Sequence, residues 1–169
     1  GTNWISQTSG TISDLSSIHF TSSQTGWAAG TGGIIINTTD GGISWNTQIS
    51  GTTNNLFSIH FADSQTGWAV GNAGTVLKTS DGGTNWIPQE SSSTSSFRSV
   101  YFVDNQTGWI VGSGGTIIKT TNGGTNWFPQ TSGGLYGLRS AHFINSQTGW
   151  SAGSAGVVLK TTNGGTDWI

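Results

Sequence analysis

Three histidines recur at one repeated position of the chain, where they could do metal chemistry. His19 and His60 lie 41 residues apart, and His142 lies two more such intervals further on. Imidazoles that repeat at one structural position can converge on a metal ion. Tyr101 takes the place between them, however, and no carboxylate or thiolate accompanies the set. The favoured interpretation is a row of rings packed at one end of a repeated strand, with no metal and no cofactor.

The residues that break the repeat are the candidates for binding. One repeat position carries Ser16, Phe57, Arg98 and Arg139, and the segment before it also varies between units. We expect these residues in the loop before the first strand of each unit, on one rim of a rigid scaffold where binding loops gather. The predicted binding residues are Phe57, Arg98, Tyr136 and Arg139. Neutral drift between the units is the alternative.

Charge and composition exclude several classes of partner. The 169 residues include 5 Lys and Arg, the formal net charge is −2, and the basic residues are spread through the chain. Without a basic patch, neither nucleic acid nor an anionic membrane surface is an expected partner. No apolar run approaches the ~20 residues that a membrane helix needs. Cys is absent, which excludes disulfides and thiolate metal sites.

Tryptophan marks an internal repeat with a period of 41 residues. One series is Trp27, Trp68, Trp109 and Trp150, and a second series is Trp4, Trp45, Trp86, Trp127 and Trp168. A period of about 40 residues is typical of propellers and other repeat architectures. The sequence therefore predicts one repeat domain over residues 1–169. The fixed recurrence favours packing of these rings between units over stacking on sugars or peptides.

Each unit contains four short segments that are typical of β-strands. In the first full unit they are expected at 15–20, 25–30, 33–39 and 43–49, each rich in Val, Ile, Thr or aromatic residues. Gly26 and its counterparts are expected to serve turns with φ > 0. Segments such as 33–36 are apolar on both faces, which indicates burial on both sides. Four-stranded sheets stacked on like sheets are the blades of an all-β propeller.

A turn motif carries the first resemblance to known proteins. Residues 38–45 resemble the Asp-box, or bacterial neuraminidase repeat, of pattern Ser/Thr-x-Asp-x-Gly-x-Thr-Trp. The motif's structural positions in the four units are Asp40, Trp45, Asp81, Trp86, Asn122, Trp127, Asn163 and Trp168. Asn replaces Asp in two units, and either side chain can accept the hydrogen bonds of the turn. The resemblance implies a hairpin between the third and fourth strands, remote from any active site.

The whole repeat unit carries a second resemblance. Segments such as 59–61, 66–71 and 74–86 resemble the photosystem II assembly factor family of propellers and related secreted bacterial proteins, and the likeness covers the whole chain. It implies a scaffold that binds proteins without catalysis, in a secreted, periplasmic or thylakoid-lumen-like location. Members of that family usually have more blades, often seven, than the four units found here.

Sialidases share the Asp-box, so hydrolysis is a further hypothesis. Their chemistry needs three arginines for the substrate carboxylate, a tyrosine nucleophile with a glutamate partner, and an aspartic acid. This chain has two arginines, Arg98 and Arg139, and its single glutamate is Glu90. The residues therefore predict a protein that is not an enzyme.

The phase of the repeat predicts how the ring closes. Residues 1–8 match the fourth strand of a unit, and blades are expected at roughly 9–49, 50–90, 91–131 and 132–169. The leading strand is expected to complete the last blade by pairing near 156–161. The stub at 166–169 competes for the same edge. An open half-ring exposes apolar faces, so a homodimer forming an eight-bladed ring is favoured, with a closed four-bladed monomer as the alternative.

The sequence leaves more than one function open. The favoured one is a non-catalytic scaffold that binds a protein or peptide, or that self-assembles. A glycan-binding propeller with one shallow site per blade is the second hypothesis, and a hydrolase is the third. Met is absent, including at position 1, and the units are nearly identical. The sequence is therefore also compatible with an excised or engineered fragment of a longer protein.

Overall fold

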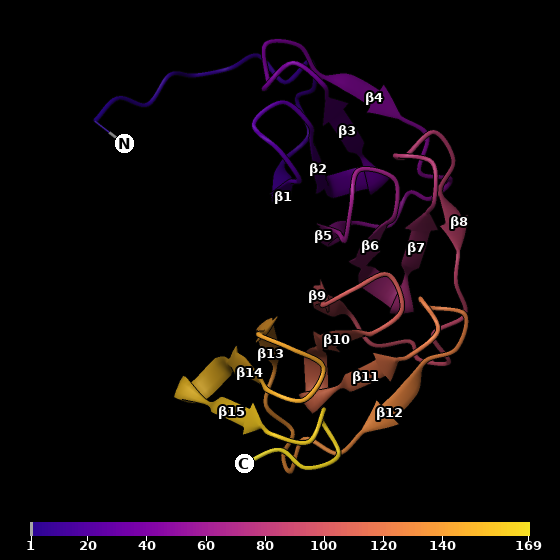
Figure 1. The fold of residues 1–169 in the computed structure, drawn as a ribbon, viewed down its shortest axis with the longest axis vertical. Coiled ribbons are helices and arrows are strands. Elements are labelled where there is room, and N and C mark those ends of the chain that lie inside the picture. Colours follow the sequence, from indigo (N-terminus) through magenta and orange to yellow (C-terminus); the bar gives the residue numbers. More distant parts are fainter. Residues whose placement is uncertain (1) are drawn as a thin grey trace.

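The protein is a half-ring of four β-sheets in the computed structural model, which describes residues 2–169 (Figure 1). The first sheet contains β1 (Leu15–Phe20), β2 (Gly26–Gly30), β3 (Ile35–Thr38) and β4 (Asn46–Gln48). The second contains β5 (Leu56–Phe61), β6 (Gly67–Gly71), β7 (Val76–Thr79) and β8 (Ile87–Pro88). The third contains β9 (Phe97–Phe102), β10 (Gly108–Gly112), β11 (Ile117–Thr120) and β12 (Phe128–Gln130). The fourth contains β13 (Leu138–Phe143), β14 (Gly149–Gly153) and β15 (Val158–Thr161).

Each sheet is an antiparallel meander, as expected for a propeller blade. Strand order follows the sequence, so that β1 pairs with β2, β2 with β3, and β3 with β4. The first strand of each blade lies on the inner side of the arc, and the fourth lies on its outer rim (Figure 1). The strands fall within the ranges expected from the sequence. A short 3-10 turn joins the second and third strands, at Thr31–Gly33, Asn72–Gly74, Ser113–Gly115 and Ser154–Gly156.

The core lies between neighbouring blades. Each of three apolar clusters joins one blade to the next, and the middle strands are buried on both faces, as with Ile35 and Ile36 of β3. Trp27, Trp68 and Trp109 are at most 1% exposed, so packing between blades accounts for that series. Fully burying large apolar side chains stabilises a fold by roughly 1.5–3 kcal/mol each, which makes the blade-to-blade contacts the main stabilising element.

The glycine that begins the second strand has a different role from the expected one. Gly26, Gly67, Gly108 and Gly149 are not among the glycines with positive φ, so the expectation of a left-handed turn was wrong. A Cβ on Gly67 would instead lie 2.6 Å from ring atoms of Phe61. The absence of a side chain lets the phenylalanine of the first strand lie flat across the second strand.

The Asp-box forms the predicted hairpin. Gly41 and Gly42 have φ values of 75° and 90°, the left-handed region that favours glycine. Asp40 Oδ1 accepts hydrogen bonds from the Ser44 backbone amide (2.9 Å) and from Thr38 Oγ1 (2.7 Å). The Ser44 hydroxyl, followed by its amide, holds the pKa of the Asp40 carboxyl at about 2. Asn163 Oδ1 accepts the equivalent backbone bond from Asp167 (3.0 Å), so Asn preserves the turn.

The four blades form an open arc, and a single chain does not close into a four-bladed ring (Figure 1). The last sheet has three strands, so the pairing of residues 3–8 with β15 is not formed within the chain. Gln7 lies beside the first blade instead, where its Nε2 donates to Gly41 O (3.3 Å). The backbone of Ile169 exchanges two hydrogen bonds with Lys160 of β15. Over residues 2–169 the structure contains no helix that is long and apolar enough to cross a membrane.

Candidate functional site

A β-bulge near the start of each inner strand presents the residues that vary between units. In β9, Phe97 pairs with Gly112 and Ser99 pairs with Val111, which leaves Arg98 as the extra residue. The same register shift leaves Ser16, Phe57 and Arg139 as the extra residues of β1, β5 and β13. A bulge redirects one side chain out of the ordinary alternation of a strand. These residues therefore belong to the inner strands, and their expected placement in the preceding loops was wrong.

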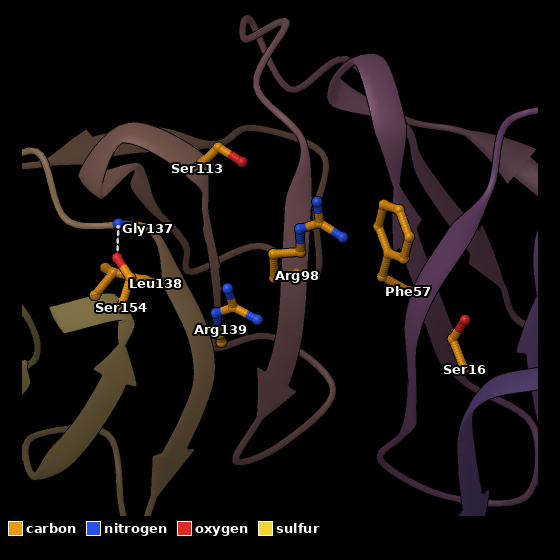
Figure 2. Close-up of a pocket in the computed structure, with 8 residues that line it drawn as sticks. All are labelled: Ser16, Phe57, Arg98, Ser113, Gly137, Leu138, Arg139 and Ser154. Atoms are coloured by element: carbon orange, nitrogen blue, oxygen red, sulfur yellow. Dashed lines mark hydrogen bonds between the residues drawn. The ribbon is translucent and has the colours of Figure 1, made fainter. Parts of the chain in front are cut away.

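The four bulge residues line one surface pocket of about 420 Å³ (Figure 2), and the strands that carry them are those on the inner side of the arc in Figure 1. Phe57, Arg98 and Arg139, predicted separately from the sequence, come together here. The full lining is Ser16, Phe57, Arg98, Ser113, Gly137, Leu138, Arg139 and Ser154. Both arginines are exposed to solvent, whereas Phe57 is half-buried.

The electrostatic character of the pocket comes from its two guanidinium groups. Arg98 Cζ lies 4.1 Å from the ring centroid of Phe57, in the position of a cation–π contact. Figure 2 shows Arg98 between Phe57 and Arg139, with the Arg98 guanidinium group turned toward the Phe57 ring. No Asp or Glu is among the lining residues. This arrangement is suited to an anionic group, because two forked donors can bind carboxylate oxygens bidentately.

Two serines complete the polar wall of the pocket. Ser113 and Ser154 begin the 3-10 turns of the third and fourth blades. Ser154 Oγ accepts a hydrogen bond from the Gly137 amide (3.0 Å), which is drawn in Figure 2. Neither serine was among the residues predicted from the sequence. The available signal was their shared repeat position, occupied by Thr31 and Asn72 in the first two units.

Tyr136 lies apart from this group. It is not among the residues that line the pocket, although the next residue, Gly137, is. Its side chain is 42% exposed and its ring covers Gly134, where a Cβ would lie 2.2 Å from Tyr136 Cε2. Its role in binding stays a prediction.

The recurring histidines form a stack of rings along the inner strands. Ring centroids are separated by 4.7 Å from His19 to His60, 4.9 Å from His60 to Tyr101, and 4.8 Å from Tyr101 to His142. Burial, reinforced by the charge of His19, lowers the pKa of His60 to about 4. Packing thus explains the repeated position, as expected. Between residues 2 and 169, the structure has no cluster of three or more His, Cys, Asp or Glu side chains that could hold a metal ion.

Several solved structures share this fold. YCF48 bound to a D1 peptide is 23% identical, with a TM-score of 0.76 over 94% of this chain and 53% of that one. YCF48 from Cyanidioschyzon merolae is 22% identical, with a TM-score of 0.73 over 93% of this chain and 56% of that one. The chain thus spans little more than half the length of either protein. No curated protein sequence matches it.

Two further structures show how widely the fold is used. The computationally designed Ika4 protein is 16% identical, with a TM-score of 0.77 over 95% of this chain and all (100%) of that one. The GH74 enzyme of Niastella koreensis is 18% identical, with a TM-score of 0.74 over 92% of this chain and 29% of that one. At these identities the likeness concerns the fold alone, which serves both enzymes and other proteins.

Family membership rests on the sequence itself. The profile of the family described as photosynthesis system II assembly factor YCF48 matches residues 2–86, 48–129 and 91–169, three overlapping stretches that together cover nearly the whole chain. The resemblance inferred from the repeat unit is thereby confirmed, and the chain belongs to the YCF48 family of propeller proteins.

Proposed function

We propose that the protein is a non-enzymatic scaffold that binds a peptide segment through a carboxylate held by Arg98 and Arg139. The observation that carries this proposal is the convergence of both arginines and Phe57 on one pocket. A carboxylate from an acidic side chain or a chain terminus would accept hydrogen bonds from both guanidinium groups. The apolar face of Phe57 offers packing for the adjoining part of the peptide.

Peptide binding by a relative supports this choice. The YCF48 structure described above was solved with a D1 peptide bound. Rigid rings of strands also suit such recognition, because the side chains are presented from strands whose positions are fixed by the core. In this chain the two arginines lie on adjacent inner strands, β9 and β13, so their spacing is set by the packing of the two blades.

The chemistry of the pocket does not favour hydrolysis or sugar binding. Glycoside hydrolysis generally needs two carboxyl groups that flank the scissile bond, and none lines this pocket. A lectin-like site in every blade would need an exposed aromatic platform, whereas Trp27, Trp68 and Trp109 are buried between blades. The inner position also changes from Ser to Phe to Arg along the arc, so the site differs from blade to blade.

The experiment compares a fluorescein-labelled pool of acidic octapeptides with the same pool capped as C-terminal amides and with a neutral pool. Fluorescence anisotropy should show binding of the acidic pool, with loss of at least about tenfold in affinity when Arg98→Gln and Arg139→Gln are combined. Lys160→Gln is the control outside the pocket: it removes one positive charge, against two in the double variant, from a side chain that lies over Trp150. Equal binding of acidic and neutral pools, or equal loss with Lys160→Gln, would refute the proposal.

The homodimer and the eight-bladed ring expected from the sequence also remain proposals for this scaffold. They concern the ends of the arc and are independent of the pocket, so each can fail without the other.

A further inference from the structure

Serine side chains tie the inner strands of neighbouring blades to one another. In each case a serine Oγ accepts a hydrogen bond from a backbone amide of the next inner strand. The pairs, each at 3.2 Å, are Ile59 N–H to Ser17, Val100 N–H to Ser58 and Ala141 N–H to Ser99. The inner strand lies at the edge of its sheet, so amides that point away from the sheet need a partner elsewhere. The serines supply that partner to three buried residues.

The serine of each pair directly follows a bulge residue. Ser99 follows Arg98 in β9. Its donor, Ala141, lies two residues after Arg139 in β13. The bond from the Ala141 amide to Ser99 Oγ therefore joins the two strands beside the points where the two arginines leave them. Figure 2 shows Arg98 and Arg139 on these neighbouring strands.

The bulges make this bond important for the placement of the arginines. The register shifts leave Arg98 and Arg139 without an opposite residue in β10 and β14, so pairing within each sheet is interrupted there. The rings of Tyr101 and His142 also link β9 to β13, with centroids 4.8 Å apart. They lie three positions further along their strands than the arginines. The Ser99 bond is the closer of these two links to the guanidinium pair.

We propose that Ser99 is a positioning residue for the anion-binding pair, and that its bond to the Ala141 amide sets the spacing of Arg98 and Arg139. This inference rests on the proposed function, in which the two arginines hold one carboxylate. Two guanidinium groups can bind the same carboxylate only if their geometry is held within roughly 0.5 Å. A link that fixes the two strands next to the arginines meets this need without touching the peptide.

The repeat provides matched controls for this role. Ser17, Ser58 and Ser99 accept the same kind of bond at the same length, so alanine at each position should lower the thermal midpoint by a similar amount. Their relation to the site differs. The Ser17 bond joins β1 to β5 and reaches neither arginine strand, whereas the Ser58 bond joins the strand of Phe57 to that of Arg98.

Anisotropy titration with the acidic octapeptide pool tests the proposal. Ser99→Ala should weaken binding at least about fivefold, because a charge-assisted hydrogen bond to the carboxylate loses its alignment. Ser58→Ala should weaken it about two- to threefold through the Phe57 contact, and Ser17→Ala should leave it within about 1.5-fold. Ser99→Thr keeps the hydroxyl and should restore most of the affinity. Equal losses of affinity with Ser17→Ala and Ser99→Ala would reduce Ser99 to a general structural role and overturn the proposal.

A second measurement reads the strand spacing without any peptide. The chain has no cysteine, so Arg98→Cys and Arg139→Cys can be combined and labelled with nitroxides at these two positions alone. Electron paramagnetic resonance should show a wider distribution of label separations after Ser99→Ala is added, and no change after Ser17→Ala. Identical spectra in these two backgrounds would overturn the role of Ser99, even if the native chain binds the acidic pool. A selective change without peptide binding would refute the proposed function and leave the role of Ser99 in strand spacing intact.

Discussion

Arg98 lies over the ring of Phe57, with Cζ 4.1 Å from the ring centroid, although the two residues come from different blades. Both are bulge residues at one repeat position of adjacent inner strands. The contact therefore arises because the repeat places unlike side chains side by side. It fixes the direction of a guanidinium that would otherwise move freely in solvent.

This contact predicts that Phe57 contributes to peptide binding without carrying charge. Phe57→Leu should weaken binding of the acidic peptide pool about two- to fivefold, because an exposed cation–π contact is worth ~0.5–1 kcal/mol. The same substitution should leave the thermal midpoint within about 2 °C, since Phe57 is only half-buried. Anisotropy titration and thermal denaturation give the two readouts. Unchanged affinity would show that Arg98 needs no support from the ring.

The ring stack predicts a loss of stability in mild acid. His60 has a folded-state pKa of about 4, below the ordinary value of 6.5, so the unfolded chain binds more protons between those values. The contribution of neutral His60 to the free energy of unfolding is fully present well above pH 6.5. It falls as the pH drops toward 4, by on the order of 3 kcal/mol. Burial lowers the pKa of His19 as well, in the same direction.

The matched control is His60→Tyr, because Tyr101 occupies that place in the third blade. Urea unfolding at pH 7 and pH 4.5 should show a clearly smaller pH effect in this variant than in the native chain. An identical pH effect in both proteins would mean that other groups cause the acid sensitivity.

The Asp-box predicts that Asp81→Asn is tolerated and Asp81→Ala is not. Asp81 Oδ1 accepts bonds from the Asn85 amide (2.9 Å) and Thr79 Oγ1 (2.8 Å). Asn122 makes the same two bonds in the third blade, where Asn126 matches Asn85. Alanine loses both, at a cost of ~1–2 kcal/mol. Chemical denaturation should separate the two variants, and equal destabilisation by Asn and Ala would contradict the assignment.

Gly67 should be intolerant of even a methyl group. A Cβ there would meet the Phe61 ring at 2.6 Å, and that ring is held against Trp27 with centroids 3.6 Å apart. Gly67→Ala should therefore cost ~1–3 kcal/mol through overpacking. Adding Phe61→Leu should bring less than the sum of the two single effects, because the clash partner is gone. Strict additivity in a double-mutant cycle would argue against this clash.

Deleting parts of the leading segment should have unequal effects. Residues 2–5 are exposed and duplicate 166–169, so their removal should leave the melting temperature almost unchanged. Removal of residues 1–8 also deletes Gln7 and should lower the melting temperature, because Gly41 O of the first blade loses the hydrogen bond from Gln7 Nε2. Equal melting temperatures for the two deletions would rule out a structural role for Ser6 and Gln7.

Much of the fold could be predicted because strict recurrence removes local ambiguity. A single segment such as 33–36 is compatible with either a helix or a strand. Four aligned copies of it, each flanked by glycine turns, predict strands. The burial of Trp27 and the stacking of His19 on His60 followed from the same recurrence. The role of Gly67 did not, because contact with a ring six residues away leaves no signature distinct from that of a turn.

The site was predicted only in part, for a geometric reason. Variation between units identified Phe57, Arg98 and Arg139, and a bulge that is invisible in the sequence turns all three toward one pocket. Ser113 was not predicted because it comes from a turn in another part of the blade, and only the folded arc brings it to the pocket that Arg139 also lines. Single-residue patterns carry no information about such convergence.

The bond from each tryptophan to the next Asp-box has a consequence for unfolding. Every blade is tied to its neighbours by one equivalent link, so stability is distributed along the arc as a sum of nearest-neighbour terms. An arc has two end blades, each held on one side only, and fraying should begin there. A closed ring has no end blade, so its loss of structure would have to start by breaking two links simultaneously. Closure of the ring would therefore replace the stepwise unfolding of end blades with a single cooperative unfolding transition.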